Sequence, residues 1–215
     1  MELTPQEKRI FNRLAHVFAP YLQSVPEAIM NKKGFDLSEL PSDLQSALIS
    51  ELQAFYIADT EAIRLRDKLP SYHQDSISSA AASWARNSTF ALVKDLNDST
   101  MMMVQNVVAT AQETPGMTLD DMTRMLEPAF GKQRAQAIAI TETTRASAAA
   151  VGVLQEYYRD SGLTYQRQWI TNRDEQVCPI CGPLNGKYEP QWADRFPDGP
   201  PAHPNCRCFL VLKRR

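Results

Sequence analysis

The sequence contains no cysteine before Cys178, and no apolar run approaches the roughly 18–20 residues that a membrane-spanning helix needs. Its first residues, MELTPQEKR, lack the basic segment followed by an apolar segment that is typical of a secretory signal. We therefore expect no membrane association and synthesis in a cytosol, where thiols stay reduced. The four cysteines all lie between Cys178 and Cys208. Clustered thiols in a reducing compartment favour a metal site over disulfides.

The sequence also lacks a strong excess of charge of either sign. Its formal net charge is −2 and its isoelectric point is near 5.9, so the whole chain offers no electrostatic footprint for nucleic acid. Residues 1–160 carry 15 Lys and Arg against 20 Asp and Glu, a net charge of −5, and residues 161–215 carry 8 against 5, a net charge of +3. A solvated surface explains this mild asymmetry as well as an acidic partner does.

Helical periodicity dominates the first two-thirds of the chain. Thr4-Pro5-Gln6-Glu7 is a capping box with proline at the first helical position, and it begins a helix that we expect Pro20 and Pro26 to interrupt. Four further helices are expected: from Pro41 to Pro70, over residues 74–113 with a break near Asn97-Asp98-Ser99, from a cap at Thr118 to Pro128 and Gly131, and from Lys132 to Asp160.

The pattern changes after Gly162. Leu163, Tyr165, Arg167 and Trp169 alternate with polar residues, which predicts a strand, and Phe209–Leu212 predicts a second one. Asn185-Gly186 suits a type I′ hairpin turn. Seven of the fourteen prolines lie between these strands (residues 179, 183, 190, 197, 200, 201 and 204), with few apolar residues among them. Burial alone cannot hold such a segment together, so we expect a covalent or metal staple.

The expected staple consists of Cys178-Pro-Ile-Cys181 and His203-Pro-Asn-Cys206-Arg-Cys208. These are five candidate ligands, Cys178, Cys181, His203, Cys206 and Cys208, for about four positions of a tetrahedral zinc site, and the spacing leaves open which four bind. Two alternatives remain: reduced thiols with His203 capping a turn, or an oxidised cysteine pair in a mature particle. A thioredoxin-type redox motif is disfavoured because Gly182-Pro183 prevents a helix after Cys181.

A catalytic role for the zinc is not expected. Five candidate ligands leave no open position for water, and Glu189 and Asp174 are only nominal bases. A nuclease with zinc knuckles would need a further histidine beside an acid, but only His16 and His73 remain, and both fall on predicted helices near the N-terminus. We therefore predict a structural zinc and no enzymatic activity.

A second motif, which contains threonines and a pair of opposite charges, lies on the last predicted helix over residues 138–147. Glu142 and Arg145 are i, i+3 neighbours and can pair. They form either a surface ion pair of little energetic value or a link that faces the zinc module and ties helix to strand. The small residues 146–150 (Ala, Ser, Ala, Ala and Ala) allow close packing at this position.

Together these motifs resemble the phage Mu F-like head morphogenesis, or minor head protein, family. The residues that carry the resemblance lie between residues 118 and 212, in the family's order: Thr141-Glu142, Arg145-Ala146, Gly162, Trp169, Asp174, Cys178-Pro-Ile-Cys181, Leu184-Asn-Gly186 and His203-Pro-Asn-Cys206-Arg-Cys208. The resemblance implies a virion protein of low copy number that associates with the phage portal and other head proteins, in the host cytoplasm during assembly and then in the virion head.

These observations predict a mainly α protein with a small C-terminal α+β module. Residues 1–114 would form a helical, portal-docking region, and residues 115–215 a Mu F-like domain in which a long helix packs on a Pro-rich β module stapled by zinc. The predicted function is head morphogenesis, in which the protein would act during DNA packaging or ejection. It would also contact the packaged DNA with low specificity. The alternative is a zinc-dependent nucleic-acid-binding protein or nuclease, supported by the basic end Lys213-Arg214-Arg215.

Overall fold

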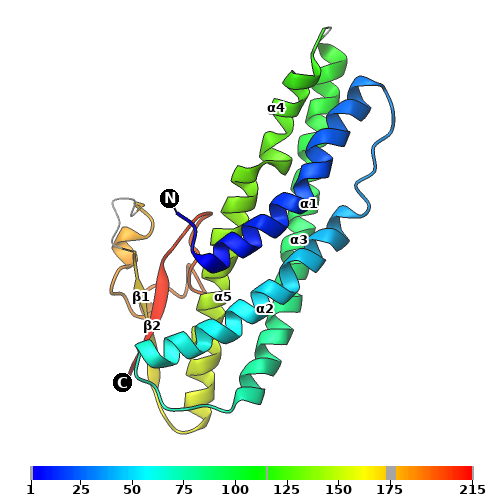
Figure 1. Cartoon of the computed structure of the whole chain (residues 1–215). Helices are drawn as coiled ribbons and strands as arrows, with labels where there is room; N and C mark the ends of the chain where they lie inside the picture. The colour runs from blue at the N-terminus through cyan, green and yellow to red at the C-terminus, as the bar shows by residue number, and fades with distance from the viewer. Residues whose placement is uncertain (1, 115, 173–177, 215) are drawn as a thin grey trace. The chain divides into compact units, whose positions relative to one another are not determined.

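The computed structural model describes residues 2–114, 116–172 and 178–214. Its elements are α1 (Pro5–Met30), α2 (Leu40–Arg66), α3 (Gln74–Glu113), α4 (Leu119–Phe130), α5 (Lys132–Asp160), β1 (Tyr165–Ile170), two single 3₁₀ turns at Gly182–Leu184 and Glu189–Gln191, and β2 (Phe209–Arg214) (Figure 1). The expectation of a mainly α protein with a small C-terminal α+β module is confirmed. Within the described residues, no helix is both long and apolar enough to span a membrane.

The chain forms two compact units that interleave along the sequence. One consists of Met1–Glu51 and Arg86–Ala139, and the other of Leu52–Ala85 and Ile140–Arg215. Helices α2, α3 and α5 each contribute residues to both units. The division at residues 114 and 115 that the sequence favours stays a prediction, and Pro115 itself lies outside the described residues.

The first unit is built from α1, α4 and the adjoining parts of α2, α3 and α5. Its core includes Ile10, Leu14 and Phe18, which recur at helical spacing on α1 and are fully buried. The ring of Phe130 at the end of α4 lies edge-on to Phe18 and stacks on Tyr21, with ring centroids 6.2 and 5.7 Å apart. Apolar burial therefore holds this unit together.

Two expected helix breaks are wrong. Helix α1 continues through Pro20 and Pro26, because its buried stripe extends to Val25 and offsets the roughly 3 kcal/mol that an internal proline costs. Helix α3 is continuous through the polar cluster at residues 97–99, since the Ser99 and Thr100 hydroxyls donate to the Leu96 carbonyl and are satisfied inside the helix. The capping boxes at Thr4 and Thr118 are confirmed.

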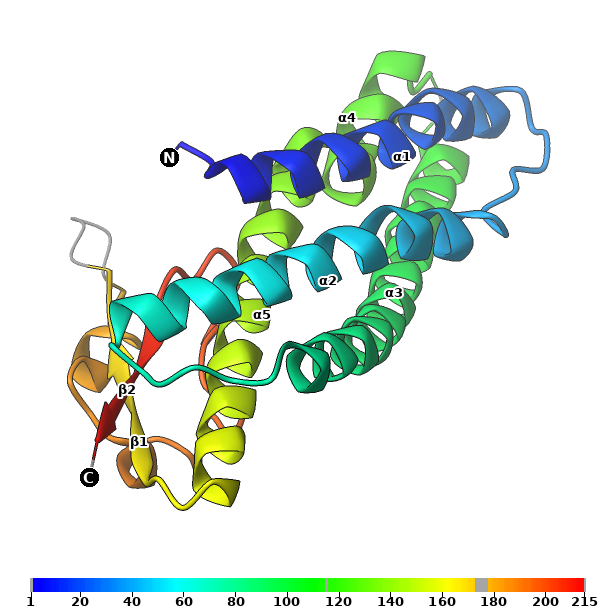
Figure 2. The same cartoon turned by 60° about the horizontal axis from the view of Figure 1, so that its bottom comes forward.

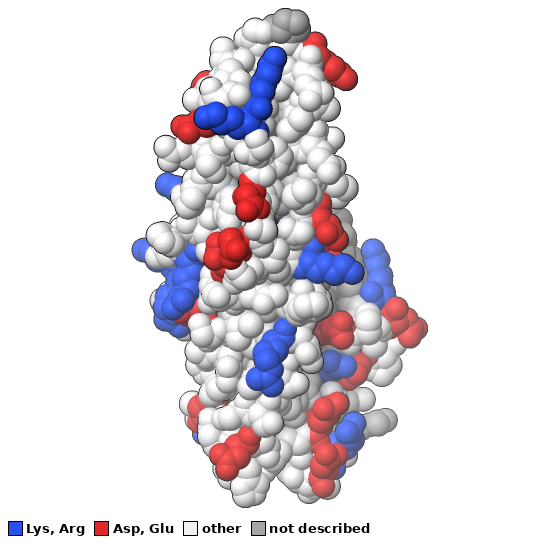
Figure 3. All heavy atoms as spheres, turned by 90° about the vertical axis from the view of Figure 1, so that its right-hand side faces the viewer, with Lys and Arg blue, Asp and Glu red and all other residues white. Residues whose placement is uncertain are grey.

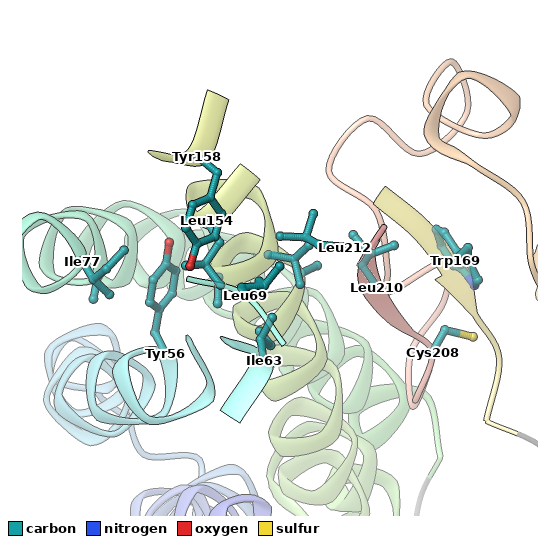
Figure 4. Close-up of a cluster of buried hydrophobic side chains, with 14 of the residues drawn as sticks. Tyr56, Ile63, Leu69, Ile77, Leu154, Tyr158, Trp169, Cys208, Leu210 and Leu212 are labelled. Carbon is teal, nitrogen blue, oxygen red and sulfur yellow. The ribbon is translucent and has the colours of Figure 1, made fainter. Parts of the chain in front are cut away.

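The second unit joins the C-terminal half of α2 and the start of α3 to α5 and the sheet. Its core draws apolar residues from all of these elements (Figure 4). The Tyr56 hydroxyl donates to the Ala149 carbonyl at 3.2 Å, Arg66 Nη2 donates to the Leu210 carbonyl at 2.7 Å, and the Leu212 amide donates to Asp67 Oδ2 at 2.8 Å. Residues 52–85 are thus part of the unit that contains the Pro-rich segment.

Strands β1 and β2 pair antiparallel, with Trp169 opposite Leu210. Figures 1 and 2 show them side by side, next to the C-terminal half of α5. The Trp169 carbonyl accepts from the Gly186 amide and the Trp169 amide donates to the Lys187 carbonyl, so this segment also lies along β1.

The predicted type I′ hairpin at Asn185-Gly186 is wrong. Asn185 has φ −57° and ψ 125° and Gly186 has φ 78°, the geometry of a type II turn, closed by a hydrogen bond from the Lys187 amide to the Leu184 carbonyl. A type I′ turn connects the two paired strands of a hairpin. Here the residues before Asn185 form a 3₁₀ turn and not a strand, so there is no hairpin for such a turn to close.

Candidate metal centre

The structure brings the five predicted ligands together in the second unit. Cys178 and Cys181 flank a turn directly before the first 3₁₀ turn, and His203, Cys206 and Cys208 lie on the loop that enters β2. Their ligand atoms form two groups, each within 4.8 Å throughout: Cys178, Cys181 and His203, and Cys181, Cys206 and Cys208. Cys181 belongs to both groups.

Three separations between ligand atoms come within a few tenths of an ångström of those in a tetrahedral site. His203 Nε2 lies 3.1 Å from Cys178 Sγ and 3.3 Å from Cys181 Sγ, and the sulfurs of Cys181 and Cys206 are 3.8 Å apart. Zinc bonds of about 2.3 Å to sulfur and about 2.0 Å to nitrogen imply ligand–ligand separations of about 3.5–3.8 Å at tetrahedral angles. Thiolate and imidazole donors are also those that zinc prefers. The Cys/His groups can therefore hold a metal ion.

Local backbone geometry aims these side chains. The Cys181 amide donates to Cys178 Sγ at 3.3 Å and the Gly182 amide donates to the Cys178 carbonyl at 3.0 Å, which folds the Cys-x-x-Cys segment into a tight knuckle. His203 Nδ1 lies 2.8 Å from the Pro204 carbonyl. A proton on Nδ1 would satisfy this carbonyl and leave the Nε2 lone pair directed at the cysteines, the usual arrangement of a ligating histidine.

Helix α5 anchors the loop that carries three of the ligands. The buried Thr144 hydroxyl donates to the Cys206 carbonyl at 2.6 Å, and Thr141 Oγ1 accepts from the Asn205 amide at 3.0 Å. Thr141 and Thr144 lie one turn apart and so share a helix face. No role for Thr144 follows from the sequence alone, because a threonine inside a helix gives no sign of a distant backbone partner.

The thiols have unequal acidities in the absence of metal. The pKa of Cys206 is lowered to about 5, chiefly because the Cys208 side chain donates a hydrogen bond to its thiolate. For the same reason, and through burial, the pKa of Cys208 is raised. Burial raises the pKa of Cys181 to about 12. Cys181 and Cys208 therefore keep their protons at neutral pH until a cation neutralises the cluster, and metal binding would release protons from them.

The pKa values of the other two candidate ligands shift in opposite senses for metal binding: that of Cys178 is lowered, which favours the ligating thiolate, and that of His203 is raised, which opposes the ligating neutral imidazole. Burial acts to raise the pKa of Cys178, but hydrogen bonds from Cys181 and Ile180 prevail and lower it. Burial acts to lower the pKa of His203, but the Pro204 carbonyl and the Cys206 and Cys178 thiolates prevail and raise it. The raised pKa favours the protonated imidazole, so protons compete with a metal ion for this histidine.

Glu142 and Arg145 form an ion pair, with Arg145 Nε 3.2 Å from Glu142 Oε2. The Arg145 side chain is half exposed but the Glu142 side chain is only 2% exposed, and burial raises the pKa of this carboxyl against the opposing effect of Arg145. The pair is thus not a plain surface pair. Its expected link from helix to strand stays a prediction, and Thr141 and Thr144 of the same helix bond to the ligand loop.

Of the two residues considered as catalytic bases, Glu189 is held by other side chains and Asp174 lies outside the described residues. Glu189 pairs with Arg167 and accepts from Gln155 Nε2 at 3.3 Å, and these contacts hold its pKa below the usual range, with Arg167 the main cause. The two histidines outside the cluster lie elsewhere: His73 packs edge-on against Tyr157, and His16 lies on α1. The groups of possible metal ligands found in the described part of the chain include neither histidine.

Comparison with known proteins agrees with the motif pattern. The family model described as Phage Mu protein F like protein matches residues 103–211, more than half of the 215-residue chain. No curated protein and no solved structure matches the chain. The matched range contains the five clustered ligands and both anchoring threonines of α5. The chain therefore belongs to the Phage Mu protein F-like family.

Proposed function

We propose that the protein is a minor head protein that associates with the phage portal during head morphogenesis. Membership of the Phage Mu protein F-like family indicates a phage head-morphogenesis protein, and this match is the observation that carries the proposal. The protein would be assembled in the host cytoplasm at low copy number and then remain in the virion head. Its contribution would be architectural, at the stage of DNA packaging or ejection.

Exposed apolar side chains in the first unit support a docking role. Phe90 and Met102 on α3 are 67% and 60% exposed, and Met30 at the end of α1 is 39% exposed. A cavity of about 780 Å³ opens between the ends of α1 and α3, and its lining mixes apolar side chains such as Ile29 with the lysines Lys32 and Lys33. Large exposed apolar and methionine side chains are typical of surfaces that bind another subunit.

The large apolar side chains of residues 1–114, the expected docking region, are divided between core and surface. Phe18 and Tyr56 belong to the cores of their units, whereas Met102 is exposed. Phe90, which the periodicity did not single out, is the most exposed large apolar side chain described. We therefore assign docking to the exposed side chains of α3.

Zinc is the metal we propose for the Cys/His cluster. Cys178, Cys181, His203, Cys206 and Cys208 are the residues available to hold it, and bound zinc would supply a structural crosslink between the knuckle at residues 178–181 and the loop at residues 203–208. The chain's own residues orient this crosslink: the Pro204 carbonyl fixes the histidine ring, and Thr144 fixes the backbone of Cys206.

The proposal is tested by recovering the tagged full-length protein from infected or induced cells. We expect the portal protein to co-purify with the wild-type chain, and the Phe90→Ser/Met102→Ser variant to lose at least tenfold of the recovered portal. Leu65→Ser changes an equally exposed apolar residue of the other unit and is the matched control. The proposal is wrong if the portal is absent from the wild-type sample or if the α3 variant recovers as much as the control.

Full-length variants are required, because removing residues 1–114 would also remove Leu52–Ala85 from the core of the second unit.

The alternative of a nucleic-acid-binding protein makes a different prediction. On the face shown in Figure 3, Lys and Arg side chains are interspersed with Asp and Glu side chains, and neither sign forms a continuous patch. DNA binding by the full-length protein that weakens steeply with added salt, together with no portal in the recovered complex, would favour this alternative.

A further inference from the structure

Trp169 on β1 has a buried donor without an acceptor. The side chain is fully buried, and its ring packs against Trp192 and Phe196 with centroids 5.6 and 5.5 Å away. Among the residues that the structure describes, nothing meets hydrogen-bond geometry with its indole Nε1. Buried indole N–H groups nearly always have a partner, so this orphaned donor calls for a physical explanation.

The sulfur of Cys208 is the acceptor that lies beside this donor. Trp169 pairs with Leu210 across the sheet, and Cys208 precedes Leu210 by two residues on the same chain. Figure 4 shows the two side chains together, with the indole nitrogen on the ring edge toward the sulfur.

The neighbouring tryptophan provides an internal comparison. Trp192 is equally buried and contacts the same aromatic cluster, but its Nε1 donates to the Lys187 carbonyl at 3.1 Å. Its donor is therefore satisfied by the backbone. The lack of a partner is specific to the tryptophan that lies beside a candidate ligand.

A metal-bound thiolate is the acceptor that this donor lacks. A protonated thiol is a weak acceptor, whereas a thiolate carries the negative charge that strengthens an N–H···S hydrogen bond. Groups that donate to ligating atoms orient them and tune the affinity for the metal. Cys208 also lies in the group with Cys181 and Cys206, so its sulfur is placed to reach a shared ion.

We propose that Cys208 is a metal ligand and that Trp169 is its positioning residue, whose indole N–H donates to the Cys208 thiolate when the metal is bound. This inference rests on the metal centre of the proposed function and extends it. Of the five candidate ligands for about four positions, Cys208 would then be one that binds the metal. The tryptophan of β1 would have a role beyond filling the core.

The test uses the full-length protein loaded with ¹¹³Cd²⁺, with its tryptophan indoles labelled with ¹⁵N. We expect the indole proton of Trp169, identified by its absence in Trp169→Phe, to show scalar coupling to ¹¹³Cd through the Cys208 sulfur. A tryptophan that merely fills the core would show no such coupling. The indole proton of Trp192 serves as the internal control and should show none.

Metal affinity, measured by competition with a chelator, provides the second readout. Trp169→Phe should weaken zinc binding about 10- to 100-fold, in the range found for groups that orient metal ligands. Trp192→Phe removes the same atoms from the same aromatic cluster and should change affinity less than about threefold. Cys208→Ser should weaken binding at least as much as Trp169→Phe.

The outcomes separate this inference from the one on which it rests. Stoichiometric metal binding without coupling to the Trp169 proton, and with equal affinity in Trp169→Phe, would overturn the assignment of Cys208 and Trp169 but leave the metal centre standing. Failure of the wild-type protein to bind zinc or cadmium would remove the metal centre itself. If Trp169→Phe does not fold, the Trp169 proton is identified by elimination with Trp84→Phe and Trp192→Phe, because the chain has three tryptophans, and its coupling in the wild-type protein decides.

Discussion

The helical unit around α1 and α4 and the segment from Cys178 to Cys208 achieve order by different means. The helices bury large apolar side chains such as Leu14 and Phe130. In the cysteine segment the buried side chains are Trp192, Pro200 and three of the four cysteines, and regular structure is limited to two 3₁₀ turns. Where apolar burial is this sparse, ligand atoms occupy the positions that a core would otherwise fill.

Because the two regions are stabilised by different interactions, we expect each to lose its folded structure without the other. Backbone ordering costs about 1–2 kcal/mol per residue, and a short segment with few buried side chains cannot recover this cost from the hydrophobic effect. A bound structural zinc contributes on the order of 10 kcal/mol or more, coupled to folding. The helices need no such contribution.

The largest expected effect comes from removing the metal ligands of the knuckle. Purified protein should contain close to one equivalent of zinc, and Cys178→Ser/Cys181→Ser should contain none. Hydrogen-exchange protection should then be lost over about residues 165–212, while most of the helical circular dichroism remains, because the helical stripes pack without metal.

Chelation of the wild-type protein should reproduce this result. Full retention of zinc in the double variant, or collapse of the whole helical signal on chelation, would show that the two regions do not differ in this way.

A smaller effect is expected from the opposite experiment, on the helical unit. Phe130→Ala should destabilise this unit by about 3–5 kcal/mol, because the ring is fully packed against Phe18 and Tyr21 and its loss leaves a cavity. Thermal unfolding should shift accordingly, while zinc content stays at that of the wild type. Loss of zinc from this variant would mean that the helical core and the metal centre depend on each other.

The smallest effect should come from the link between α5 and the ligand loop. Thr144→Val removes one buried hydroxyl that donates to the Cys206 carbonyl, and it should cost about 1–3 kcal/mol because that carbonyl loses its partner. The loss should appear as weaker zinc binding, measured by chelator competition. Thr110→Val removes a comparable but exposed bond to the Asn106 carbonyl and should leave zinc affinity unchanged.

Equal zinc affinity in the two threonine variants would show that α5 does not position the ligand loop.

Helix starts and the candidate Cys and His residues were predictable because they depend on local signals. The capping boxes at Thr4 and Thr118 require only residues within one turn, and the spacing of the two motifs pointed to the five residues that the structure brings together. The breaks expected at Pro20, Pro26 and residues 97–99 were wrong for the same reason. The rule that proline interrupts a helix takes no account of the buried face that stabilises α1. The rule that polar clusters break helices takes no account of the hydrogen bonds from the Ser99 and Thr100 hydroxyls to the Leu96 carbonyl inside α3.

The sequence by itself determined the helices, the two strands, the five clustered Cys and His residues and the family. Each depends on periodicity or on a short motif, which neighbouring residues along the chain specify. Only the tertiary structure decided that Leu52–Ala85 share a core with the C-terminal module, that Thr144 holds the Cys206 carbonyl and that the buried indole N–H of Trp169 has no partner among the described residues. All three depend on contacts between residues far apart in the chain, which are set by how faces pack and which no local pattern encodes.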